Sequence, residues 1–362
     1  MLNIFLGYAC NFKCGYCLQS PSSSPPRHNP QDVDRFVEKI IPYIQNNGID
    51  EISYWGGEPL LYWPRIKAIH EGLLRAGLTF GFVKFVTNGS LLEDHHVEVL
   101  NRWDAYVVIS HHSWQEPHSS QEPRPTLGKH SQQGESTPPD APSWDKVARL
   151  CRSSVSFLFT HEDLFAWPWF RVLEDLEQHW GRPFFPYVHW VRATEGCAPG
   201  FYLTHDDLDI HVPHLWELAE QRLEGDRHAH FMFEGHLRDW RRDFHPDGDS
   251  KPMCHGDHHI SVDLAGNRYG CHHSARVELR TGSIFAPEGP TPTTERAIAH
   301  VEKFVKSGDC MVCPIRSWCR GNCHLSNTHD VDCRLAKKKH KLLAWIDAQE
   351  NGSNNRNTIK VP

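Results

Sequence analysis

The first two hundred residues alternate two kinds of sequence pattern, and this alternation constrains the fold more than any other feature. Short runs rich in β-branched and aromatic residues are typical of strands, and the segments between them carry apolar residues at helical spacing. Strands that alternate with helices form a parallel sheet of βα units. The predicted strands are residues 3–7, 51–55, 80–86, 105–110, 155–160 and 184–190. Six such units predict an α/β fold with an open, partial barrel.

The clearest helix is predicted between the first two strands. Asn29 is a suitable N-cap, Pro30 suits the first helical position, and Pro42 inside the pattern is able to bend or end the helix. The other helices are predicted at residues 63–76, 92–103, 144–151 and 163–180, and helical sequence returns from about 204 to 242. Residues 115–142 are rich in Pro, Ser and Gln, which predicts a long loop on the barrel rim, either a plain insertion or a substrate lid.

Twelve cysteines in 362 residues indicate either disulfides or metal. The first residues show no basic segment followed by an apolar run, as a signal peptide would, and no apolar run is long enough to span a membrane. We therefore expect a cytoplasmic protein whose reduced cysteines bind metal. The net charge of −7, from 38 basic and 45 acidic residues, argues against binding to nucleic acid or to an anionic membrane.

Cys10, Cys14 and Cys17 directly follow the first predicted strand. Three closely spaced thiolates on one loop can hold three corners of a 4Fe-4S cluster and leave one iron open for reaction. Taken alone, the spacing also fits a fragment of a zinc site. Two more motifs end the next two strands, where barrel active sites are assembled: Gly56-Gly57-Glu58-Pro59 and Thr87-Asn88-Gly89-Ser90.

Together, the three motifs resemble the signature of the radical S-adenosylmethionine (SAM) enzymes, over about residues 1–205. The resemblance implies that the three cysteines hold a 4Fe-4S cluster whose open iron binds SAM. It also implies that Gly56, Gly57 and Glu58 receive the methionine amino group, and that Asn88 and Ser110 lie near the ribose or the carboxylate. In this family the reduced cluster cleaves SAM, and the resulting 5′-deoxyadenosyl radical takes a hydrogen atom from the substrate.

One departure from the family pattern follows the fourth predicted strand. Relatives in the maturase branch carry Ser-Leu-Asp-Gly there, whereas this chain has Ser110-His111-His112-Ser113. Ser110 is retained, and the contact that the Asp makes in those relatives is in doubt at His112. Both histidines are otherwise read as polar loop residues.

A second group of cysteines follows a shift in composition after residue 242. They are Cys254, Cys271, Cys310, Cys313, Cys319, Cys323 and Cys333. Seen alone, a short C-x2-C spacing also fits tetrahedral zinc. Behind radical SAM motifs, however, the order of the seven is similar to the SPASM extension, which implies two auxiliary 4Fe-4S clusters.

The same resemblance implies how the ligands are divided. The nearer cluster would take Cys254, Cys271 and Cys323, and the farther one Cys310, Cys313, Cys319 and Cys333. The nearer cluster then lacks a fourth ligand, which would be Cys197, a histidine of residues 255–259, or the substrate. Sulfatase maturases of this architecture carry a catalytic Asp directly after the second SPASM cysteine, where this chain has His272. A neutral imidazole accepts a proton near pH 7, so His272 is a candidate base, while a sulfatase-specific assignment is not supported.

These patterns predict four segments: a radical SAM partial (β/α)6 barrel at 1–215, a helical linker at 216–250, a cysteine-rich SPASM domain at 251–340, and a helix end with a disordered tail at 341–362. The leading hypothesis is a radical SAM oxidoreductase that forms a crosslink or an unsaturation in a peptide or protein, as in ribosomal peptide maturation. Two auxiliary clusters suit a net oxidation, because a substrate radical must lose one more electron.

This hypothesis implies partners: a peptide or protein substrate and an external one-electron reductant of the flavodoxin or ferredoxin type. Only nine residues precede Cys10, so leader-peptide recognition is expected from the barrel mouth, the loop after Trp114, or a separate binding protein. Two alternatives remain open at this point. One is a radical SAM dehydrogenase of a small molecule, and the other is a zinc-stabilised binding protein.

Overall fold

The computed structural model describes residues 1–12, 14, 16–17, 31–111, 142–159, 169–191, 197, 202–243, 260–269, 279–285, 310, 312–319, 326 and 328–352. The predicted loop up to residue 141, the predicted tail after residue 352, and the stretches that hold His112, His255 to His259 and His272 lie outside these residues.

Six parallel strands form the predicted sheet. They lie in the spatial order β6-β5-β4-β3-β2-β1 and pair only in parallel with one another. The strands are β1 (Leu2–Phe5), β2 (Glu51–Trp55), β3 (Phe82–Thr87), β4 (Tyr106–His111), β5 (Ser153–Phe159) and β6 (Phe185–Trp190). This confirms the six predicted strands, with their ends shifted by one or two residues, and the expected α/β class.

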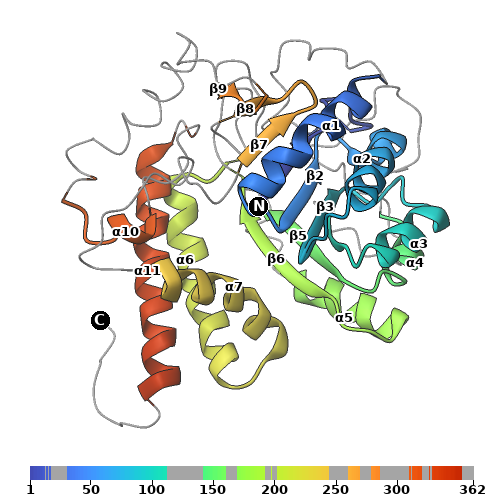
Figure 1. Ribbon diagram of the computed structural model, residues 1–362. Helices are drawn as coiled ribbons and strands as arrows, with labels where there is room; N and C mark the ends of the chain where they lie inside the picture. The colour runs from blue at the N-terminus through green and yellow to red at the C-terminus, as the bar shows by residue number, and fades with distance from the viewer. Residues whose placement is uncertain are drawn as a thin grey trace.

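Helices connect these strands and cover one side of the sheet (Figure 1). They are α1 (Gln31–Asn46), the 3-10 helix η1 (Pro59–Tyr62), α2 (Trp63–Arg75), α3 (Asp94–Arg102), α4 (Trp144–Val147) and α5 (Trp169–Trp180). Pro42 lies inside α1 and does not end it. The predicted helix over 144–151 is only one turn long, because the Arg182 guanidinium binds the backbone oxygens of Ala148 and Leu150.

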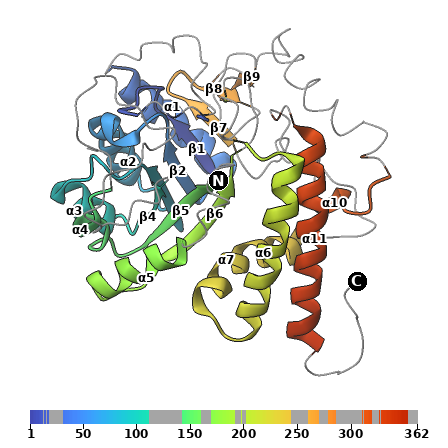
Figure 2. The ribbon, with the colours of Figure 1, turned by 180° about the vertical axis from the view of Figure 1, so that it is seen from behind.

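A second group of helices lies away from α1 to α5, on the other side of β6 (Figures 1 and 2). It consists of α6 (His205–Leu223), α7 (Arg227–Asp243) and α11 (His329–Gly352), and the short α10 (Arg316–Cys319) lies beside it. The helical sequence predicted over 204–242 is thus confirmed as two helices. Arg222 of α6 is 2.7 Å from Glu350 of α11, and the Trp216 and Trp345 rings lie 5.2 Å apart. No helix within the described ranges is both long and apolar enough to cross a membrane.

The sheet continues beyond the barrel strands. β7 (Ile260–Asp263) pairs in parallel with β1, and the antiparallel strands β8 (Asn267–Tyr269) and β9 (Arg280–Ser283) follow. The Asp263 carboxylate holds the turn after β7, because it accepts hydrogen bonds from the backbone amides of Ala265 and Asn267 and from the Tyr269 hydroxyl. Sequence patterns predicted none of these three strands. The start of the predicted cysteine-rich segment is therefore bonded to the barrel sheet.

The two faces of the sheet differ in chemistry. Ile4, Tyr54 and Phe85 belong to the large core that packs under the helices, and the Tyr54 hydroxyl lies 2.9 Å from Nδ1 of His70 on α2. Because side chains alternate along a strand, Asn3 and Ser53 lie on the opposite face, which we call the inner face. The inner face thus begins with polar residues near the start of β1 and β2.

Candidate metal and cofactor site

The loop that carries the first three cysteines begins directly after β1. The backbone amide of Phe12 donates to Sγ of Cys10 at 3.3 Å, and the amide of Cys17 donates to the Cys14 oxygen at 3.1 Å. Phe12 and Tyr16 are buried, with 6% and 8% of their surface exposed, while Cys10 is exposed and Cys14 and Cys17 are half-buried. The aromatic side chains thus anchor the loop, and none of its three cysteines is in a disulfide.

The Gly56-Gly57-Glu58 segment lies against the backbone of this loop. The Gly57 amide donates to the Gly7 oxygen, and the Glu58 amide donates to the Ala9 oxygen, both at 2.9 Å. A Cβ at Gly57 would lie 2.3 Å from the Ala9 oxygen, and one at Gly56 would lie 2.7 Å from the Gly7 oxygen. The paired glycines are therefore required by the close approach of the cysteine loop itself.

Glu58 is buried, with 1% of its surface exposed, and its carboxylate joins the ends of β2 and β3. It accepts hydrogen bonds from the Leu60 amide at 3.0 Å, the Thr87 hydroxyl at 2.6 Å and the Asn88 amide at 2.8 Å. The carboxylate thus fixes the turn after β3 relative to the segment after β2. Its role toward a SAM amino group stays a prediction.

Asn88 links the turn after β3 to the cysteine loop. Its side-chain amide donates to Oδ1 of Asn11 at 2.9 Å, and Asn11 donates in turn to the Ser90 hydroxyl at 2.9 Å. The Ser90 hydroxyl closes the ring by donating to Oδ1 of Asn88 at 2.6 Å. Gly89 has φ +73°, a conformation that favours glycine, and its oxygen accepts a hydrogen bond from the Ser143 amide at 3.1 Å. The three motifs predicted to meet at one edge of the sheet therefore do meet there.

Ser110 lies on the next strand along. It is half-buried, one residue before the end of β4, and stands opposite Ser156 of β5. Its predicted role near the ribose or carboxylate stays a prediction.

The cysteine set suits a metal centre by its own chemistry. Loss of solvent around the sulfur, together with the nearby Glu58, Cys14 and Cys17, raises the pKa of the Cys10 thiol to about 11, although the hydrogen bond from Phe12 lowers it. Three thiolates this close repel one another, and a bound cation removes that repulsion and displaces the protons. The residues present therefore fit an iron-sulfur cluster at this loop.

The described part of the second cysteine set is Cys310, Cys313, Cys319 and Cys333. All four are half-buried and outside any disulfide, and Cys333 lies in the first turns of α11. Burial and the nearby Cys313 and Cys310 raise the pKa of the Cys333 thiol, which Lys337 lowers. Cys333 therefore lies near two of the partners predicted for it, although they are at least twenty residues away in the chain.

The other predicted ligands of the second set, Cys254, Cys271 and Cys323, and the candidate base His272 lie outside the described residues. Cys197 is half-buried and Cys151 is exposed, and neither is in a disulfide.

Among the described residues, the side chains that lie close enough together to bind a single metal ion are outside both cysteine sets. Ligand atoms of three metal-binding side chains come within 4.8 Å of one another only at Glu93, His95 and His96, among the residues that could be searched. A single tetrahedral zinc with bonds of about 2.3 Å to sulfur requires thiolates closer than this limit. Neither described cysteine set has that spacing.

Sequence reasoning missed the residues that hold the cysteine loop in place. Thr87 belongs to a predicted motif without a predicted role, and neither Asn11 nor Tyr62 carries a sequence signal. The Tyr62 hydroxyl accepts a hydrogen bond from the Ala9 amide, 53 residues away. No periodicity or spacing marks such a contact in advance.

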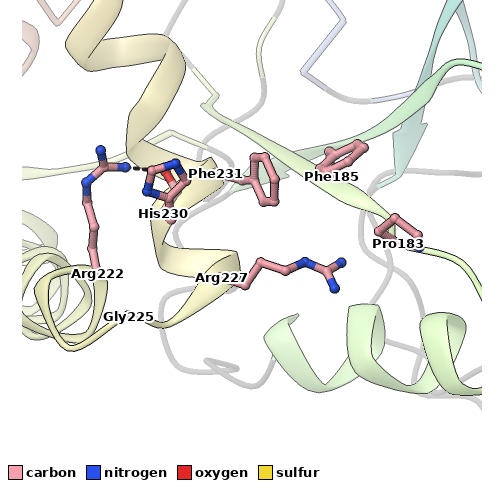
Figure 3. Close-up of a pocket in the computed structure, with 7 residues that line it drawn as sticks. All are labelled: Pro183, Phe185, Arg222, Gly225, Arg227, His230 and Phe231. Carbon is pink, nitrogen blue, oxygen red and sulfur yellow. Dashed lines mark hydrogen bonds between the residues drawn. The ribbon is translucent and has the colours of Figure 1, made fainter.

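A pocket with a volume of about 430 Å³ lies elsewhere, between the turn from α6 to α7 and the start of β6 (Figure 3). It is lined by Pro183, Phe185, Arg222, Gly225, Arg227, His230 and Phe231. Its arginines are already paired, Arg222 with Glu350 and Arg227 with Glu177. Because β6 starts here and ends at the opposite edge of the sheet, the pocket is separate from the cysteine loop.

Comparisons with known proteins agree with the motifs. Residues 4–129 match the model of the Radical SAM superfamily. The chain is 27% identical over 123 residues, 30% of its length and 26% of the relative's, to the radical SAM cyclopropyl synthase TigE of Paramaledivibacter caminithermalis. The chain spans about a quarter of the length of the curated relatives it matches.

Solved structures match over a larger share of this chain than the curated relatives do. Native anSMEcpe with bound AdoMet is 15% identical, with a TM-score of 0.66, over 96% of this chain and 99% of that one. Native anSMEcpe with bound AdoMet and the Cp18Cys peptide is also 15% identical, with a TM-score of 0.64 over the same shares. At this identity the likeness establishes the fold alone, an α/β fold with a sheet rich in parallel strands.

Proposed function

We propose that the protein is a radical SAM enzyme that oxidises a peptide or protein side chain, because residues 4–129 match the model of the Radical SAM superfamily. The observation that carries the proposal is the joining of three motifs by hydrogen bonds. The cysteine loop is bonded to Gly57 and Glu58 on one side and to Asn88 on the other. A metal centre at the thiols would therefore lie beside both segments that the family uses for SAM.

The chain's own residues have distinct tasks in this proposal. Cys10, Cys14 and Cys17 would hold a 4Fe-4S cluster, which with SAM supplies a 5′-deoxyadenosyl radical for hydrogen abstraction. Glu58 is occupied by three hydrogen bonds from its own chain, so it acts by fixing the segment around it. That leaves the backbone of Gly56 and Gly57 as the part of the motif that faces the methionine amino group.

The second cysteine set supports an oxidative reaction. Cys310 and Cys313 lie near enough to Cys333 to raise the pKa of its thiol, although Cys333 is carried by α11. We assign Cys310, Cys313, Cys319 and Cys333 to one auxiliary 4Fe-4S cluster, and Cys254, Cys271 and Cys323 to another. Such clusters are suited to accept the second electron that a net oxidation releases. An external one-electron reductant of the flavodoxin or ferredoxin type would reduce the first cluster.

The peptide substrate class is supported by two of the comparisons. The anSMEcpe fold, which covers 96% of this chain, is known with a peptide bound. TigE, to which this chain is 27% identical over 123 residues, is a radical SAM cyclopropyl synthase. We propose that a crosslink, a ring or an unsaturation forms in the substrate, with leader recognition by the barrel mouth or a separate binding protein.

Metal analysis and SAM cleavage test the proposal together. Protein purified without oxygen is expected to contain about twelve iron atoms with equal sulfide, as three four-iron clusters require. The triple variant Cys10→Ala, Cys14→Ala, Cys17→Ala should lose about four irons and all 5′-deoxyadenosine formation, while Cys151→Ala, at an exposed cysteine outside both sets, should lose neither. Colourless protein rich in zinc, or cleavage of SAM by the triple variant, contradicts the proposal.

A further inference from the structure

A row of polar residues crosses the inner face of the sheet. The parallel register pairs Asn3 with Ser261 on one side and with Ser53 on the other, and pairs Ser53 with Lys84. Residues paired in this way point to the same face, and neighbouring strands are about 4.8 Å apart. Lys84 and Asn3 therefore flank Ser53, whose side chain is shorter than either.

Several buried polar atoms on this face have no hydrogen-bond partner in the described protein. They are Nδ2 of Asn3, Nε1 of Trp55, Oγ of Ser154 and Oγ of Ser261. The residues are 6%, 8%, 2% and 1% exposed. Trp55 follows Ser53 by two positions on β2, so the strand alternation places it on the same face. A buried polar group without a hydrogen-bond partner destabilises the folded protein, which is why such groups are normally satisfied.

Lys84 adds a cation to this group. It is half-buried, and loss of solvent lowers the pKa of its ammonium group, with no carboxylate contributing to the shift. No ion pair joins Lys84 to a carboxylate within the part of the chain that the structure describes. A lysine that is largely removed from water without a counter-ion is destabilising unless a ligand supplies one.

The chemistry of the unsatisfied atoms selects the ligand. An ammonium, a side-chain amide nitrogen and an indole nitrogen are donors only, and the serine hydroxyls can also donate. Their complement is a group with acceptor oxygens and one negative charge. A carboxylate matches that description better than a phosphate, because one ammonium balances one charge.

We propose that the inner face of the sheet holds a carboxylate of the substrate, bound over Ser53 between Lys84 and Asn3 and in reach of the Trp55 indole. The site lies at the middle of the strands, since Lys84 precedes Thr87 by three residues and Ser53 precedes Gly56 by three. It therefore receives a part of the substrate that lies deeper in the barrel than the SAM motifs. The assignment to a substrate rests on the proposed function, whereas the binding of carboxylate does not.

The test uses acetate as the probe and the full chain labelled with 5-fluorotryptophan. Trp55→Phe identifies the fluorine resonance of Trp55 among the thirteen tryptophans. Acetate at constant ionic strength is expected to shift that resonance in a saturable way, while chloride and the neutral acetamide leave it in place. Lys84→Met should weaken the acetate response at least tenfold, and the matched control Lys67→Met, at an exposed lysine of α2, should leave it unchanged.

A second variant keeps the test decisive if Lys84→Met does not fold. Asn3→Asp replaces the donor amide by a carboxylate on the far side of Ser53 from Lys84, where it repels a bound carboxylate, so it should abolish the acetate response. An equal response to acetate and acetamide, or an unchanged acetate response in Lys84→Met or Asn3→Asp, overturns the site. A response that SAM abolishes assigns the carboxylate to the cofactor and overturns the substrate role. Formation of 5′-deoxyadenosine without substrate, measured on the same protein, reports separately on the proposed function.

Discussion

The hydroxyl oxygen of Tyr62 accepts a hydrogen bond from the backbone amide of Ala9 at 2.7 Å. The oxygen of Ala9 is bonded as well, by the Glu58 amide at 2.9 Å. The residue directly before Cys10 is therefore held on both of its polar groups by the segment that follows β2. Tyr62 also packs tightly against Gly7, since a Cβ there would lie 2.4 Å from the Tyr62 hydroxyl.

Replacing Tyr62 by Phe should loosen the loop without unfolding the protein. The ring keeps its packing, the Ala9 amide loses its acceptor, and about 1 kcal/mol of stability is lost. Alkylation of Cys10 by iodoacetamide in the metal-free protein, followed by mass spectrometry, should become several-fold faster. Tyr43→Phe, at a half-buried tyrosine of α1, serves as control. Equal rates in both variants would show that Tyr62 does not position the loop.

Glu58→Gln should destabilise the protein strongly for so small a change. The wild-type carboxylate accepts from three donors, and the amide nitrogen of Gln faces at least one of them as a second donor. The expected loss is roughly 2 kcal/mol in the free energy of unfolding, measured by urea denaturation. Glu71→Gln, in an exposed pair with Lys67, should change it by less than about 0.5 kcal/mol. A difference within error between the two variants would remove Glu58 from this structural role.

Gly57→Ala should prevent cluster assembly. The added methyl group would lie 2.3 Å from the Ala9 oxygen, so the cysteine loop must move away from its position. We expect the iron content after reconstitution to fall by about four atoms per chain, the content of one cluster. Gly81→Ala is the matched control, because its Cβ would meet nothing closer than 4.0 Å. Full iron content in Gly57→Ala would contradict the close packing described for this turn.

Stability should fall in mild acid because of His70. Burial lowers the pKa of His70 to about 4, below its value of 6.5 in the unfolded chain. As the pH falls below 6.5, the unfolded state binds a proton that the folded state does not, so stability decreases until about pH 4 and then levels off. The loss from this residue amounts to about 3 kcal/mol.

His70→Gln should flatten the pH profile of the unfolding free energy between about pH 6.5 and pH 4. The substitution also removes the contact between His70 and the Tyr54 hydroxyl at neutral pH. His179→Gln, at an exposed position of α5, should leave the slope unchanged. The same acid slope in all three proteins would mean that His70 does not remain neutral in the folded state.

The barrel strands could be predicted because each carries a local signal. Glu51–Trp55 and Phe85 in the next strand belong to runs of β-branched and aromatic residues with turn residues at their ends. The meeting of the three motifs also followed from the sequence, since parallel strands place their carboxyl ends at one edge. The hydrogen bonds that hold the motifs together could not be predicted. The bonds between Tyr62 and Ala9 and between Asn88 and Asn11 join residues that are 53 and 77 positions apart.

The strands after residue 259 escaped prediction for a different reason. Ile260–Asp263 and Asn267–Tyr269 have four and three residues, too few for a period to be seen against a background rich in Cys, His and Gly. These strands join the sheet because β7 pairs with the edge of β1 that β2 does not occupy. Likewise, the predicted helix over 144–151 ends early because of Arg182, whose contact to the Leu150 oxygen spans 32 residues.

The pairing of β7 with β1 has a consequence for biosynthesis. One edge of β1 pairs with β2 early in synthesis. The other edge cannot pair with β7 until the chain from residue 260 onward has left the ribosome. An unpaired strand edge is a template for association with other chains, and contacts this distant in sequence form slowly. Nascent chains that end before residue 260 should therefore associate through β1 and recruit chaperones, and those extended past Asp263 should not.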